Sequence, residues 1–153
     1  MRESLGGSSL LYLVVIFSSL VILFFIGILS YSKAYRIKNR IVEITEKYGT
    51  YNEVVANEIN PDLKAAGYDA SRSNRCDDIK NRLENEKYGD NLSDNLNTYG
   101  YNYCVFEVLD NNINGGNYYV IVTFVRFEFP FIGDLFMIPV HSETKILGKD
   151  YSY

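Results

Sequence analysis

Histidine and cysteine are scarce in this sequence, which argues against most catalytic and metal sites. His141 is the only histidine, and Cys76 and Cys104 are the only cysteines. No Cys-x-x-Cys pair and no cluster of His and Cys ligands occurs, so we expect no metal site. No nucleophile elbow or phosphate-binding loop is present, and His141 shares a strand face with Glu143 and Lys145, a pattern typical of a solvated surface. We therefore expect no catalytic residue, no cofactor and no enzymatic activity.

Basic residues are also scarce in most of the chain. From residue 41 onward there are 10 Lys and Arg against 18 Asp and Glu, a net charge near -8. Nucleic acids bind to basic faces, so we expect no nucleic-acid partner. The remaining positive charge is concentrated in one short stretch that contains Lys33, Arg36, Lys38 and Arg40.

Residues 10–31 form a long apolar run of 22 residues without a charge. As a helix it is about 33 Å long, enough for a bilayer core of about 30 Å. Its apolar residues occur on every face, as contact with lipid requires. A secretory signal has a shorter apolar core and a small-residue cleavage site, whereas the nearest candidate site here contains Lys33. These features favour a retained membrane anchor over a cleaved signal. Three small residues in the span form a predicted assembly face, because they allow a second helix to approach closely: Ser18, Ser19 and Gly27.

Helical periodicity continues beyond the uncharged run. Ile37, Ile41 and Ile44 recur at helical spacing and form an apolar packing stripe, and Gly49 supplies a stop signal. The pattern predicts one helix from about Ser9 to Tyr48. The sequence thus divides into a short leader (1–9), a transmembrane helix (10–32), a helix extension (33–48) and a soluble domain (49–153).

The soluble domain is predicted to contain short helices followed by strands. Thr50 and Glu53 form a capping-box pattern before a short helix that Pro61 interrupts or restarts and Gly67 ends. A second short helix begins at Cys76, and residues 88–100 are expected to form a loop. Residues 101–109, 118–129 and 137–146 are typical of strands. The predicted fold class is therefore α+β: a long N-terminal helix, short helices and a three-stranded antiparallel meander that the isoleucine stripe covers.

Cys76 and Cys104 are 28 positions apart, which suits one disulfide that closes a long loop. The alternative is two buried free thiols, because cysteine is a common core residue. A disulfide persists outside the cytosol. The basic residues 33–40 favour the opposite orientation, with the domain in the cytoplasm. We expect a single-pass membrane protein whose C-terminal domain is extracytoplasmic.

Two further patterns lie near the predicted hairpin turn. Residues 110–115 imitate the first half of a calcium loop, but Ile121 stands where the bidentate glutamate is needed, so a simple turn is favoured. Several tyrosines cluster nearby and suit either a protein-contact patch or core packing: Tyr99, Tyr101, Tyr103, Tyr118 and Tyr119.

A glycine-containing leader, a single long N-terminal helix and a C-terminal antiparallel sheet resemble pilins and pseudopilins. Residues 10–40 and 120–146 resemble most closely the TadE-like minor pseudopilins of tight-adherence pilus systems. The resemblance implies leader cleavage at Gly6 or Gly7. It also implies assembly through the N-terminal helix with other pilin-like subunits or membrane assembly proteins. Such proteins usually place a glutamate five residues past the cleavage point, where this chain has Leu11 or Tyr12.

Two functions follow from these patterns. In the first, the chain is a membrane-anchored pseudopilin, a structural subunit of a pilus or secretion-type assembly. In the second, it is a single-pass anchored domain that binds another partner and joins no filament.

Overall fold

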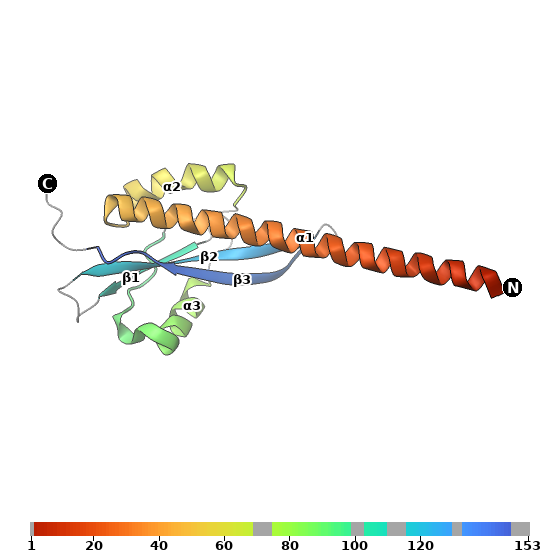
Figure 1. Ribbon diagram of the computed structural model, residues 1–153. Coiled ribbons are helices and arrows are strands. Elements are labelled where there is room, and N and C mark those ends of the chain that lie inside the picture. The colour runs from red at the N-terminus through yellow and green to blue at the C-terminus, as the bar shows by residue number, and fades with distance from the viewer. Residues whose placement is uncertain (1, 69–74, 99–102, 110–115, 130–132, 148–153) are drawn as a thin grey trace.

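The computed structural model describes residues 2–68, 75–98, 103–109, 116–129 and 133–147. The fold is α+β, as predicted: a long helix α1 (Arg2–Tyr48) and two shorter helices precede a three-stranded antiparallel sheet in the order β1-β2-β3. The first half of α1 projects from the domain and the second half packs on it (Figure 1). The helix continues without a break because the span contains no proline and because the isoleucine stripe follows in the same helical phase.

The sheet is a meander of unequal strands. β1 (Tyr103–Leu109) pairs with β2 (Asn117–Phe129), and β2 pairs with β3 (Gly133–Glu143). The predicted strands are thus confirmed, with shifted ends. β2 and β3 are longer than β1, so they run on as a two-stranded ribbon that points the same way as the bare half of α1 (Figure 1). Residues 110–115, which imitate the first half of a calcium loop, lie outside the described residues.

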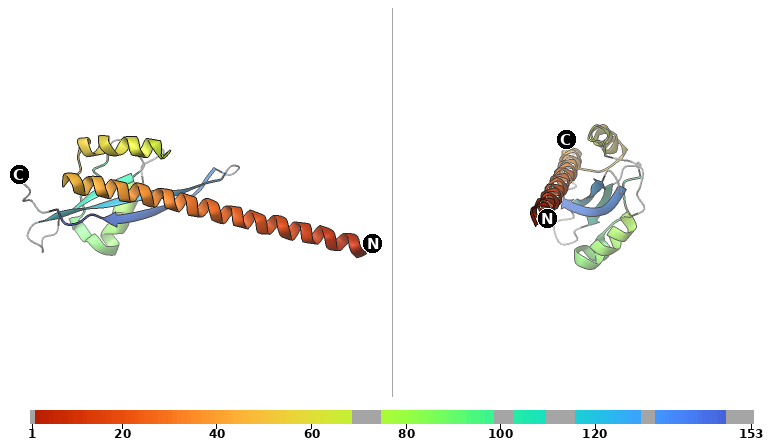
Figure 2. Two further views of the ribbon diagram at one scale, coloured as in Figure 1. Left: turned by 45° about the horizontal axis from the view of Figure 1, so that its top comes forward. Right: turned by 90° about the vertical axis from the view of Figure 1, so that its right-hand side faces the viewer.

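Helices cover both faces of the sheet and create three layers (Figure 2). On one face, Ile37, Ile41 and Ile44 of α1 join Tyr103 and Ile121 in one hydrophobic cluster. Helix α2 (Glu53–Ala65) contributes Val55, Ala56, Ile59 and Leu63 to the same side. On the other face, α3 (Cys76–Leu83) and the turns after it pack on alternate strand residues. The side chains of residues 103–106 and 119–125 are therefore buried on both faces, which explains the nearly continuous apolar sequence there.

Helix α2 differs from the prediction at its N-cap and at Pro61. Its N-cap is Asn52, whose side chain accepts a hydrogen bond from the Val55 N–H, so the prediction of Thr50 as the cap was wrong. Asn is as good a cap as Thr, and only the packed chain decides between them. Pro61 lies inside the helix and does not break it. The helix continues because Ile59 and Leu63, on either side of Pro61, are both buried in the core.

Cys76 and Cys104 are joined in the structure, with their sulfur atoms 1.97 Å apart. The bond links the first residue of α3 to Cys104 in the edge strand β1. Both residues are buried in the cluster that contains Phe106 and Val122. The disulfide therefore fastens a helix of eight residues, too short to be stable alone, to the face that it covers.

The outer edge of β1 is closed by the chain itself. Ser93 and Leu96 donate backbone hydrogen bonds to the carbonyls of Glu107 and Val105. The side chains of Ser93, Asn95 and Asn97 bond the other outward groups of β1: Glu107 N–H, Val105 N–H and the Tyr103 carbonyl. Part of the predicted loop at 88–100 thus acts as an irregular edge strand. The outward backbone groups of Val105 and Glu107 and the Tyr103 carbonyl are therefore already bonded and closed to another chain.

The outer edge of β3 carries a proline. Pro139 pairs with Phe124. The N–H of Phe124 donates to the Tyr68 hydroxyl, which in turn donates to the Phe124 carbonyl, so both backbone groups of Phe124 point away from β3. In an antiparallel pair the opposite residue then also points away, and Pro139 faces the open edge. Because proline has no N–H, this edge lacks a donor that strand addition needs.

Candidate functional site

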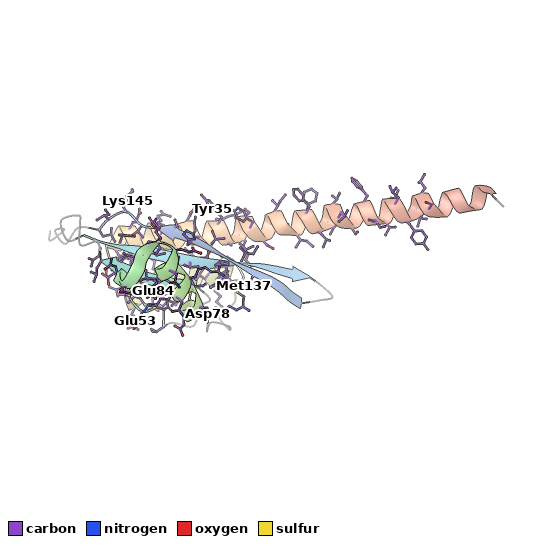
Figure 3. The ribbon with its side chains drawn as sticks, turned by 90° about the horizontal axis from the view of Figure 1, so that it is seen from below. Tyr35, Glu53, Asp78, Glu84, Met137 and Lys145 are labelled. Carbon is purple, nitrogen blue, oxygen red and sulfur yellow. A yellow bond between two sulfur atoms is a disulfide. The ribbon has the colours of Figure 1, made fainter. Side chains whose placement is uncertain are left out.

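The N-terminal half of α1 is bare from Ser9 to Phe25, where every side chain is exposed. Its most apolar window has none of its residues buried, and the helix is long and apolar enough to cross a membrane. Side chains radiate from it on all sides with no other element beside its first turns (Figure 3). Large exposed side chains include Phe17 and Phe24, at 66% and 69% exposure. In water such a surface is a strong driving force for burial, so this segment needs a partner or a lipid environment.

The three small residues predicted as an assembly face do not share one side of α1. Ser18 and Gly27 are nine positions apart, which places them about 180° apart around a helix. Gly27 is half-buried and lies one heptad before Ala34, on the side that packs against the sheet. Ser18 is exposed on the opposite side, and Ser19 is exposed, with its hydroxyl bonded to the Ile16 carbonyl. Ser18 therefore marks the side free for contact with a neighbour.

Tyrosines stand near both ends of the bare segment. Tyr12 and Tyr31 are exposed, and their separation along a helix is about 28 Å, close to the thickness of a bilayer core. Tyr31 stacks on Tyr35, with ring centroids 6.3 Å apart, and the Lys38 ammonium lies 4.2 Å from the Tyr35 ring centre. Tyr35 lies where α1 enters the domain (Figure 3). Aromatic rings followed by basic groups are typical of a membrane–water boundary.

Helices α1 and α2 are antiparallel, and polar contacts join them along their length. Lys47 and Tyr48 bond Glu58 at one end, Arg40 bonds Asp62 at 2.8 Å in the middle, and Lys33 bonds the Gly67 carbonyl at the other end. The Tyr48 hydroxyl and then the Lys47 ammonium lower the pKa of Glu58. The hydrogen bond to Asp62 raises the pKa of Arg40. These contacts keep the axis of α2 aligned with that of α1.

A groove opens between α1 and the C-terminal end of α2. Its volume is about 450 Å³, and Leu29 of the uncharged run forms part of its wall. Ile37, Ile59 and Leu63 supply apolar lining. Polar groups line it as well: Ser32, Lys33, Arg36, Arg40 and Asp62. The groove thus lies where the bare part of α1 meets the domain, and its charged lining is three cations against one carboxylate.

The other residues considered from the sequence lie away from this region. His141 is exposed on β3, near a cluster in which Glu143 accepts hydrogen bonds from Lys87 and Tyr88. Within the described residues, no group of three or more His, Cys, Asp and Glu side chains is arranged to hold a metal ion.

The tyrosine cluster is at least partly a core feature. Tyr103 and Tyr119 are buried and Tyr118 is half-buried, while Tyr99 and Tyr101 lie outside the described residues. The Tyr103 hydroxyl lies 2.7 Å from that of Tyr51, which also donates to Asn97. This buried polar network went unnoticed in the sequence because Tyr51 is 46 and 52 positions away from Asn97 and Tyr103.

Comparison of the chain with protein-family models, with curated proteins and with solved structures finds no match.

Proposed function

We propose that this chain is a membrane-anchored, pilin-like structural subunit of a pilus or secretion-type assembly, similar to the TadE-like minor pseudopilins. The observation that carries the proposal is the single helix α1. One half of it is apolar and bare on all sides, and the other half is part of the hydrophobic core. A subunit built in this way packs its helix with those of its neighbours and presents its domain outside the helical bundle.

The continuity of α1 supports a structural role. A flexible linker lets an anchored domain move freely, whereas an uninterrupted helix fixes its position relative to the span. The two hydrophobic clusters and the disulfide make the domain rigid around the second half of α1. In this proposal no residue has a catalytic role, and the partners are lipid and other subunits.

The disulfide and the buried state of its cysteines favour an extracytoplasmic domain. The basic residues Lys33, Arg36, Lys38 and Arg40 favour the cytoplasm by the positive-inside rule. The structure weakens that argument. Lys33 and Arg40 are engaged with α2, and Lys38 is buried against Tyr35, so three of the four cations have a role within the fold.

A second candidate function is a single-pass anchored domain that binds a partner and joins no filament. The absence of a glutamate at Leu11 and Tyr12 favours it, because that residue normally guides docking into a pilus. Both positions are exposed on the bare helix. The two functions differ in the fate of the leader, since a filament subunit must be cut and an anchored domain need not be.

The mature N-terminus tests the choice between them. We expect mass spectrometry of the membrane fraction from the native cells to find a chain that begins after Gly6 or Gly7. Replacing both glycines by leucine should leave the leader in place, because a leader peptidase needs small residues at the cut. An uncut wild-type chain that carries its full leader would contradict the pseudopilin proposal and favour the anchored domain.

Orientation has a separate test. The native cysteines are buried and bonded to each other, so a thiol reagent does not report on them. Glu53, at the exposed start of α2, is a suitable position for a new cysteine (Figure 3). We expect an impermeant maleimide to label Glu53→Cys in intact cells as fully as after lysis, with the wild-type chain as the unlabelled control. Labelling only after lysis would place the domain in the cytoplasm.

A further inference from the structure

We propose that the groove between α1 and the end of α2 binds the headgroup of an anionic phospholipid. The inference rests on the membrane anchoring in the proposed function and adds a specific ligand to it. The groove opens beside Leu29, the last part of the uncharged run on this side of α1. If residues 10–31 cross the bilayer, the groove lies at the level of the headgroups.

The lining combines the two chemistries that a phospholipid offers. Ile37, Ile59 and Leu63 form apolar lining next to the span, suited to the glycerol backbone and the first acyl carbons. Lys33, Arg36 and Arg40 stand around it and suit the phosphate. The volume of about 450 Å³ lies in the range of small-ligand sites. A free phosphate ion would make no favourable contact with the apolar half of the groove, so the lining favours a lipid.

Arg36 is the cation available to the ligand. Lys33 donates to the Gly67 carbonyl at 2.9 Å and Arg40 bonds Asp62 and Glu43, so both already hold the fold together. Arg36 is exposed, and among the described residues no hydrogen bond or ion pair engages its guanidinium. It lies on the same side of α1 as Leu29 and Ser18, so it follows the exposed apolar residues along this side of the helix. The small residues Ala65 and Ala66 leave that side of the groove open.

The test measures lipid retention by the full chain in a neutral detergent. Native mass spectrometry counts bound phosphatidylglycerol and phosphatidylcholine of the same acyl length on the monomer. We expect phosphatidylglycerol to be retained preferentially, with the preference reduced about fivefold in Arg36→Gln, the effect of one interfacial cation. Arg36→Lys should keep most of the preference. Arg82→Gln, which removes the same charge from α3 on the opposite face, should leave it unchanged.

Four outcomes would overturn the proposal. The first is equal retention of the two lipids, and the second is an equal loss of the phosphatidylglycerol preference in Arg36→Gln and Arg82→Gln. The third is displacement of the lipid by inorganic phosphate alone, and the fourth is a lipid-free dimer in which a second copy fills the groove. Circular dichroism of Arg36→Gln should match the wild type, because the residue is exposed. Since the measurement uses monomers, it does not depend on filament formation. A chain that stays soluble without detergent would instead contradict the membrane anchoring itself.

Discussion

Replacing Cys76 and Cys104 together by alanine is expected to lower the free energy of unfolding by about 3–4 kcal/mol. The bond closes a loop of 28 residues, and the chain-entropy model assigns that much to the restricted unfolded chain. A small domain has only about 5–15 kcal/mol of stability, so the loss is a large fraction of the total. The chain has no tryptophan and 14 tyrosines, so urea unfolding followed by near-ultraviolet circular dichroism of the tyrosines is the appropriate measurement.

The matched control is the wild-type chain treated with a reducing agent. It should unfold at the same urea concentration as the double variant, because both lack only the covalent link. Helix α3 should loosen first, since what then holds it is the packing of Ile79 and Leu83, the ion pair of Lys80 with Asp94 and the turns that follow. A loss below about 1 kcal/mol in both samples would mean that packing alone holds α3 on the sheet.

The parts of the fold that the sequence predicted well are those in which the signal is local. Uncharged residues 10–31 and the stripe of Ile37, Ile41 and Ile44 are each set by helical spacing within one segment. The three strands were predicted from runs of β-branched and aromatic residues bounded by Asn, Gly and Pro. Their pairing in sequence order then follows from short connections.

The features that were missed depend on contacts between distant segments. The cap at Asn52 and the unbroken helix at Pro61 follow from how α2 packs on α1. The closed edge of β1 depends on Ser93, Asn95 and Asn97, whose alternation is visible in the sequence but indicates a loop equally well. The groove at Arg36 exists only because α2 folds back along α1 and ends in two alanines.

These edge contacts bear on how copies of the chain would associate. Strand addition to β1 requires the removal of its own hydrogen-bonded segment, and Pro139 deprives β3 of a donor. Residues 41–153 carry a net charge near -8, so two copies of the domain repel each other. The bare half of α1 remains the large apolar surface available for self-association among the described residues.

The geometry of α1 also indicates which side of that surface is used. Gly27 lies on the side of the helix that packs on its own domain, as Ala34 and Ile41 do. Ser18 lies about 180° from Gly27, on the side of the helix away from the sheet. In a bundle of such subunits the domains are bulky and stay outside, so the helix sides opposite the domains meet in the centre.

We therefore expect Ser18→Cys to form a crosslinked dimer in membranes under mild oxidation, and Gly27→Cys to form several-fold less. Helices that pack through small residues approach closely enough for a disulfide to form between cysteines at position 18. Position 27 is partly covered by its own domain, so cysteines there do not come close enough. The native cysteines are already paired and do not contribute. Residues 33–153, which contain both hydrophobic clusters, should run as a monomer at physiological salt. Equal crosslinking from both positions would indicate random collisions in the membrane. A stable dimer of residues 33–153 would move the contact to the domain and contradict assembly through the helix, because the apolar span would then be dispensable.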